Sequence, residues 1–185
     1  MDYAVLIPAA VLFTVLQALA VRKNFYSREY AFMAENIFLC AAVDLLIAFN
    51  GRFPYPFHPF ILVCLAASVA GDTFLGKTRD LYHLSMSYDR VVHLLGCFSF
   101  ALFVYGVFRN LFGPVRPDYY LPVIVVTAGI SVGVLFEIFE FAMDALPKKK
   151  RMPKRQHGLT DTDFDLLFDA IGSLLAGIAA RFLFL

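Results

Sequence analysis

Tryptophan is absent from this chain of 185 residues, cysteine is scarce and charged side chains are few. The three cysteines, Cys40, Cys64 and Cys97, all lie inside apolar runs. Their odd number and their spacing argue against a disulfide framework or a cysteine metal site, so we expect small buried side chains. Only 17% of the residues are charged, and the net charge is +1. The composition therefore gives no electrostatic reason to expect a nucleic-acid partner.

A signal peptide is also not indicated, because the N-terminal stretch MDYAVLIPAA has no basic region before its apolar residues. What the chain has in excess is apolar surface. Hydrophobic residues make up 60% of it, with 21 Phe among them, whereas a soluble domain has about 45–50%. A core of this size cannot hide that much apolar surface from water, so the expected surroundings are lipid.

Six apolar runs approach the roughly 20 residues that a membrane-spanning helix needs. They cover residues 3–21, 35–50, 57–76, 91–108, 120–144 and 164–184. The second run is the weakest, because it is short and carries Asp44 near its middle. The sequence therefore predicts an all-α fold, a polytopic transmembrane bundle of about six helices in a single domain over 1–185.

The segments between the runs are polar or rich in turn formers. Residues 51–59 contain three prolines, and residues 109–119 are similar, so neither is expected to form regular helix. Residues 147–158 form a basic linker. Its Lys148, Lys149, Lys150 and Arg151 are candidates for contacting anionic lipid headgroups.

The distribution of Lys and Arg predicts the orientation in the membrane. The first, third and fifth connections carry 12 of these residues, and the other side carries 4. Because cytoplasmic loops are enriched in positive charge, we expect the odd-numbered loops in the cytoplasm and both termini outside. The expected location is a prokaryotic plasma membrane.

Acidic residues inside apolar runs are costly and need an explanation. Asp89 and His93 stand four residues apart near the start of the fourth run, and share one helix face. Asp89 is also a candidate N-cap. The alternative to a functional pair is a cap together with a buried structural histidine.

The fifth run ends with Glu137, Glu140 and Asp144, which share a face with Gly133. Glycine there favours close approach of a neighbouring helix. Asp144 suits a position at the water interface. Glu137 does not, because apolar residues flank it on both sides.

The sixth run opens with a series of aspartates. Thr160 or Asp161 is expected to cap this helix, and acids in its first turn suit the helix dipole. Asp165 and Asp169 lie deeper on one face, followed by the small residues Gly172, Ser173 and Gly177.

The predicted topology brings these groups to one side of the membrane, with Asp72 at the same level. Self-repulsion of the carboxylates would be relieved by protonation, by pairing with Arg90 or the basic linker, or by a divalent cation. A donor set of oxygens with one imidazole favours magnesium or manganese over structural zinc. The candidate metal ligands are His93, Glu137, Glu140, Asp165 and Asp169. The wider polar site adds Asp89, Arg90 and Asp161.

The order of these motifs resembles a known family. Asp89-Arg90-x-x-His93, then Glu137-x-x-Glu140, then Asp161-Thr162-x-x-Asp165 and the Gly172-Ser173 helix are similar to the uncharacterised membrane proteins typified by YjdF. The wider VanZ-like group has a related layout, but with Lys, Gln and Asn where this chain has Arg90, Glu140 and Asp169. The resemblance covers residues 88–178 and implies the fold and the location of the site, with no established activity.

Three functions stay open at this point. The first is a non-catalytic membrane protein that binds a lipid or a partner, with the cluster as a polar lock between helices. The second is a metal-dependent intramembrane enzyme acting on a lipid or polyprenyl phosphate. The third is a proton- or cation-coupled transporter, for which Asp44 is the acid at mid-depth. The chain shows no Ser-His-Asp or Cys-His motif that would predict a catalytic nucleophile.

Overall fold

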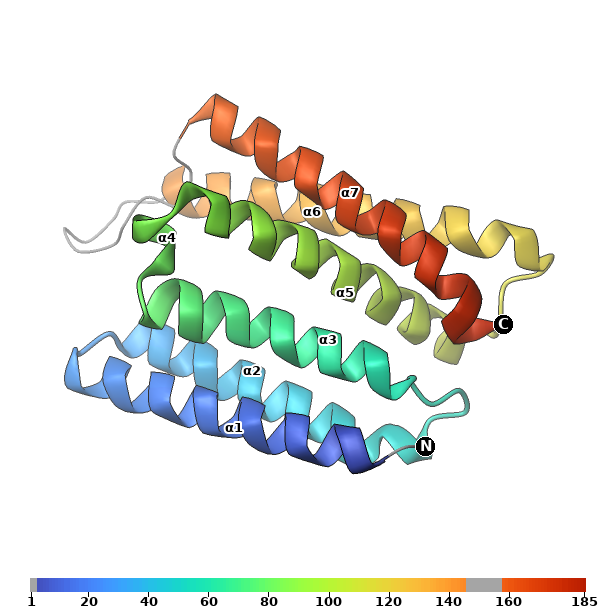
Figure 1. Ribbon diagram of the computed structural model, residues 1–185, viewed down its shortest axis with the longest axis horizontal. Helices are drawn as coiled ribbons and strands as arrows, with labels where there is room; N and C mark the ends of the chain where they lie inside the picture. The colour runs from blue at the N-terminus through green and yellow to red at the C-terminus, as the bar shows by residue number, and fades with distance from the viewer. Residues whose placement is uncertain (1–2, 146–157) are drawn as a thin grey trace. The chain divides into compact units, whose positions relative to one another are not determined.

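A computed structural model describes residues 3–145 and 158–185 (Figure 1). These residues form seven α-helices and no strand, and six helical segments are long and apolar enough to cross a membrane. The prediction of an all-α fold with six spans is confirmed. Nearly all of the predicted basic linker, with Lys148, Lys149, Lys150 and Arg151, lies outside the described residues.

Three short helical segments accompany the α-helices. In chain order the elements are α1 (Tyr3–Tyr26), α2 (Tyr30–Phe49), the 3₁₀ turn η1 (Asn50–Arg52), α3 (Pro59–Ala70), the π-helix η2 (Gly71–Thr78), α4 (Leu81–Leu84), α5 (Met86–Phe112), the 3₁₀ turn η3 (Asp118–Tyr120), α6 (Leu121–Ala145) and α7 (Leu159–Phe184). The π-helix continues α3, so that Pro59–Thr78 together reach spanning length.

Several helices begin about one turn earlier than the apolar runs predicted. Helices α2, α5 and α7 start at residues 30, 86 and 159, where the runs start at 35, 91 and 164. Helix α5 also continues to Phe112, into a segment predicted to be irregular. The reason is that hydropathy marks the stretch that suits lipid, whereas the hydrogen-bonded helix extends through the polar turns at either end.

The earlier starts make the predicted N-caps wrong. Asp89 lies in the first turn of α5, whose N-cap is the extended Ser85. Asp161 likewise lies in the first turn of α7, and Thr160 precedes it there, because the N-cap is Gly158. The acids still complement the helix dipole, as expected of a first turn.

The chain divides into two compact units. Unit 1 comprises Met1–Val92 with Gly106–Pro114, and unit 2 comprises His93–Tyr105 with Val115–Leu185. Two of the boundaries between them, after Val92 and after Tyr105, fall inside α5. The assignment of 1–185 to a single domain stays a prediction.

Unit 1 is built on α1, α2 and α3, with α1 and α2 lying side by side and antiparallel (Figure 1). Its buried apolar cluster consists of Phe13, Val43, Ala66, Val69 and Ala70. Gln17 of α1 donates a hydrogen bond of 2.7 Å to Thr73 Oγ1 of η2. The π-helix is therefore tied to the first helix inside the core.

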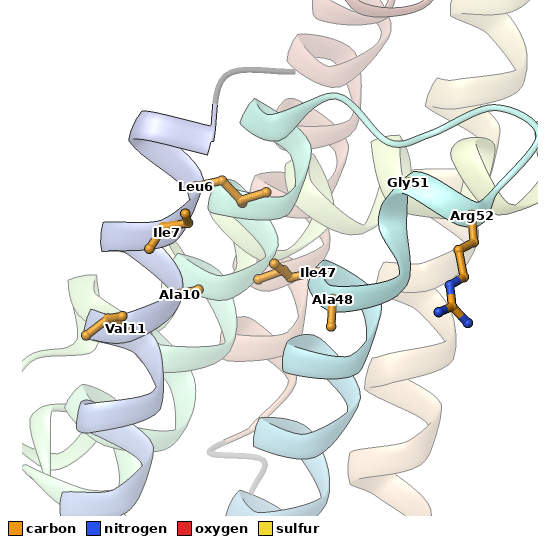
Figure 2. Close-up of a pocket in the computed structure, with 8 residues that line it drawn as sticks. All are labelled: Leu6, Ile7, Ala10, Val11, Ile47, Ala48, Gly51 and Arg52. Carbon is orange, nitrogen blue, oxygen red and sulfur yellow. The ribbon is translucent and has the colours of Figure 1, made fainter.

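A shallow apolar groove of about 390 Å³ lies on unit 1 (Figure 2). Residues of α1 and of the end of α2 and η1 line it, namely Leu6, Ile7, Ala10, Val11, Ile47, Ala48, Gly51 and Arg52. Arg52 is its one charged member, and that guanidinium stacks on Phe49 at 4.9 Å from the ring centroid. Such a lining suits contact with lipid and offers no catalytic group.

Unit 2 holds α6 and α7 against residues 93–105 of α5. Glycines make this packing close, as predicted. A Cβ atom at Gly133 would collide with the Asp169 side chain, and one at Gly172 would collide with the backbone carbonyl oxygen of Leu94. Helix backbones approach this closely only where a side chain is missing.

Candidate functional site

The centre of the site is His93, which is buried in unit 2. Its Nδ1 lies 3.1 Å from Asp169 Oδ1, and its Nε2 lies 3.9 Å from Glu137 Oε1. The first distance is a hydrogen bond and the second is too long for one. The imidazole therefore stands between a carboxylate of α7 and a carboxylate of α6.

Asp165 completes the buried set. It stands one turn before Asp169 on the same face of α7, and one of its oxygens lies within 4.8 Å of a ring nitrogen of His93. The four side chains are almost inaccessible, with exposed fractions of 8% for His93, 5% for Glu137, 4% for Asp165 and 2% for Asp169. Burial of this many ionisable groups requires compensating charge or protons.

The remaining predicted acids lie nearer the helix ends. Asp89 precedes His93 by one turn of α5, Glu140 follows Glu137 by one turn of α6, and Asp161 precedes Asp165 by one turn of α7. All three are half-buried, as is Arg90. On each helix a half-buried acid thus stands next to a deeply buried member of the site.

Asp169 fixes the histidine. A carboxylate that accepts the Nδ1–H proton selects one tautomer and leaves the lone pair on Nε2, the nitrogen that faces Glu137. Ser173 donates to the Asp169 backbone carbonyl at 2.7 Å, and Phe136 meets the imidazole edge to face with ring centroids 5.7 Å apart. The ring is therefore held in orientation.

The spacing of one donor pair suits a small cation. Two ligands of one Mg²⁺ or Mn²⁺ ion, each about 2.1 Å from the metal, are at most about 4.2 Å apart. The 3.9 Å between His93 Nε2 and Glu137 Oε1 falls inside this limit, whereas for His93 and Asp165 the distance is bounded only by 4.8 Å. A proton on His93 is the other arrangement that would neutralise the neighbouring carboxylates.

A second polar network, which the sequence did not predict, lies in unit 1. Lys77 Nζ is 2.7 Å from Glu35 Oε1 and 2.8 Å from Asp72 Oδ2, and Tyr82 donates to Asp72 Oδ1 at 2.7 Å. This network joins α2, η2 and α4. Its charged and polar groups pair with one another, so the network holds the π-helix in place.

The sequence of η2 contains a motif that also occurs in phosphate-binding loops. Residues 71–78, GDTFLGKT, match the spacing G-x-x-x-x-G-K-[ST] of phosphate-binding loops. The structure places the segment in a π-helix instead of the loop between strand and helix that such a motif needs. Lys77 is also committed to two carboxylates, so the match does not indicate nucleotide binding.

The fold and the site define a class of protein: a polytopic helical membrane protein with a buried histidine and aspartates in its interior. The chain belongs to the family described as predicted membrane protein (DUF2238), which matches residues 4–184. This family is of the YjdF type. The relation to the VanZ-like group stays a prediction.

One relative is an uncharacterised protein of Thermotoga maritima. It is 31% identical over 112 residues, which cover 58% of this chain and 55% of the relative. The chain therefore spans about half the length of that protein. No solved structure matches the chain.

Proposed function

We propose that the protein binds one divalent cation, magnesium or manganese, through His93, Glu137 and Asp165. The observation that carries this proposal is the orientation of His93. Asp169 takes up its Nδ1 while Nε2 faces a buried carboxylate 3.9 Å away. Histidines that bind metals are held in this way by a carboxylate on the other ring nitrogen.

The donor set supports a hard ion. Carboxylate oxygens with a single imidazole suit magnesium or manganese better than softer metals. The half-buried Glu140 and Asp161 stand one turn nearer the helix ends and give a hydrated cation an acidic approach. Glu140 and Asp169 complete the predicted ligand set, but here Asp169 acts as the residue that orients His93.

The ligand that we propose for the bound cation is the phosphate of a membrane lipid or polyprenyl phosphate. The site lies toward helix ends, where headgroups meet spanning helices. A divalent cation binds phosphate oxygens and polarises them, so the same site supports lipid binding and, with a bound water, hydrolysis. The charge distribution supports a plasma-membrane location with the odd-numbered loops in the cytoplasm.

The test measures bound metal in the full chain, purified in mild detergent and equilibrated with Mn²⁺. Mass spectrometry of the metal is expected to give one ion per chain. Glu137→Gln and Asp165→Asn are expected to lose it. Asp163→Asn removes an exposed acid of α7, the helix that carries Asp165. This variant is expected to keep the bound metal. Asp169→Asn should lower the affinity about 10–100-fold, as for other residues that orient a metal ligand.

The lipid is tested separately, in vesicles that contain phosphatidylglycerol. Bound Mn²⁺ is expected to broaden the ³¹P resonance of the lipid more for the wild type than for Glu137→Gln. Equal broadening would overturn the lipid ligand while leaving the cation site in place.

The second candidate is a structural lock between α5, α6 and α7, which the glycine contacts of Gly133 and Gly172 favour. In that case the folded wild type holds no Mn²⁺. Glu137→Gln and Asp165→Asn then lower thermal stability without any loss of metal. This result would overturn the cation proposal.

A further inference from the structure

Asp44 lies in the apolar middle of a span and contacts a neighbouring helix there. It belongs to the segment Tyr30–Arg52, and its partner Thr14 belongs to Ala4–Tyr26. Thr14 Oγ1 lies 3.2 Å from Asp44 Oδ1 and 3.0 Å from Oδ2. Cys40 Sγ, one turn earlier on α2, lies 3.4 Å from Oδ2. Asp44 is half-buried and Thr14 is exposed, so the pair borders the surface that contacts lipid.

The surroundings of Asp44 offer no charge to balance a carboxylate. Among the residues that the structure describes, no basic group lies within 4.0 Å of it. From α1 the facing group is Thr14, and on α2 the one titratable neighbour is Cys40. Helix α3 contributes apolar residues such as Ala66 and Val69 to the adjoining core. An ionised carboxylate is strongly disfavoured in such surroundings, and taking up a proton relieves the cost.

Thr14 is placed to serve either protonation state. Its hydroxyl is also 2.9 Å from the backbone carbonyl oxygen of Ala10. When Asp44 is protonated, its O–H donates to Thr14 Oγ1 and Thr14 donates to Ala10. When Asp44 is ionised, the threonine hydroxyl turns and donates to the carboxylate. One rotation about a side-chain bond exchanges the two arrangements.

We propose that Asp44 is a proton-binding carboxyl group at mid-membrane, reached from the lipid phase and partnered by Thr14. The proposal does not depend on the cation site in unit 2. It gives unit 1 a place to hold a proton inside the bilayer, which is the element that a proton-coupled function needs.

A hydrophobic carbodiimide, dicyclohexylcarbodiimide, tests this proposal. A protonated carboxyl adds across one C=N bond of the reagent: the acid O–H bond breaks, the proton moves to nitrogen, and oxygen bonds to the central carbon. Transfer of the acyl group to nitrogen gives a stable N-acylurea with no leaving group. In vesicles we expect one adduct per chain, on the peptide that contains Asp44.

Matched variants locate the reaction. Asp44→Asn is expected to abolish the adduct and Asp44→Glu to retain it. Asp118→Asn should leave it unchanged, because the Asp118 carboxylate is paired with Arg116 at 2.7 Å. A water-soluble carbodiimide should label Asp44 at least tenfold more slowly than the hydrophobic one.

Infrared spectroscopy gives a second measurement that needs no reagent. The carbonyl band of a protonated carboxylic acid should disappear in folded Asp44→Asn and shift in Thr14→Val. Failure of the hydrophobic reagent to label Asp44 in the folded wild type, or equal labelling by both reagents, would overturn the proposal. An infrared band that Asp44→Asn leaves unchanged would do so as well.

Discussion

At the scale of single residues, the chemistry of this protein depends on which side-chain atoms already take part in a hydrogen bond or an ion pair. Asp169 Oδ1 lies 3.1 Å from His93 Nδ1, and this contact orients the ring so that Nε2 faces Glu137. Lys77 is occupied by Glu35 and Asp72, so it offers no free ammonium to a phosphate. The two aspartates Asp169 and Asp72 thus have different roles, because one contacts a histidine and the other contacts a lysine.

Tyr82 is the residue for which a pH effect follows directly. Burial, and next the negative charge of Asp72, raise the pKa of the Tyr82 phenol well above its usual value. The unfolded chain releases this proton above about pH 10, whereas the folded chain keeps it. The folded state then holds more protons than the unfolded state, so this group lowers the free energy of unfolding as the pH rises above about 10.

We therefore expect Tyr82→Phe to be less stable than the wild type by about 1.5–3 kcal/mol at pH 7, because the hydrogen bond to the charged Asp72 is lost. Between pH 10 and pH 11 this difference should shrink by about 1 kcal/mol. Unfolding in detergent at several pH values measures both quantities. A difference that is constant from pH 7 to pH 11 would contradict the raised phenol pKa.

At the scale of elements, helix packing in unit 2 depends on missing side chains. Gly172 of α7 faces the backbone carbonyl oxygen of Leu94 on α5, and the same helix carries Asp165 and Asp169. A rigid neighbour of this kind cannot move aside as a flexible side chain would. The glycine therefore sets how close the aspartates come to His93.

Gly172→Ala is expected to destabilise the protein by about 1–3 kcal/mol through overpacking. Gly71→Ala is the matched control, because a Cβ there meets only the Tyr88 hydroxyl at 3.7 Å. It should cause no loss of stability and a gain of up to about 1 kcal/mol, because alanine is favoured over glycine in a helix. Thermal unfolding of both variants in the same detergent decides the matter. Equal losses would show that the contact with Leu94 is not what limits the packing.

At the scale of the whole molecule, the orientation of the six candidate spanning segments in the membrane stays a prediction. An even number of spans would put both termini on one side, and the excess of Lys and Arg in the odd-numbered connections predicts that this side is the outside. The proposed cation site, at the other ends of α5, α6 and α7, would then face the cytoplasm.

Cysteine labelling in intact bacterial cells tests this orientation. After replacing Cys40, Cys64 and Cys97 by Ala, we expect Pro114→Cys to react with a membrane-impermeant maleimide in whole cells. Ser85→Cys should react only after the cells are permeabilised. Both positions are exposed. The reverse pattern would show that the odd-numbered loops face outward.

The sequence by itself determined the class of fold, because lipid imposes a simple rule. A segment that crosses the bilayer must be apolar over its length, so hydropathy locates each span to within about a turn. The same rule made buried acids conspicuous, and Glu137, Asp165 and Asp169 were singled out for that reason. Hydropathy did not predict the first residue of each helix, because polar first turns still form helical hydrogen bonds.

Only the tertiary structure decided which residues contact one another. Contacts between distant parts of the chain set the orientation of His93, the pairing of Lys77 with Glu35, and the partnership of Thr14 with Asp44. None of these contacts leaves a periodic pattern in the sequence, because each depends on the packing of one helix against another. Of these residues, His93, Asp169 and Asp44 were singled out from the sequence, whereas Lys77, Glu35 and Thr14 were recognised only from the structure.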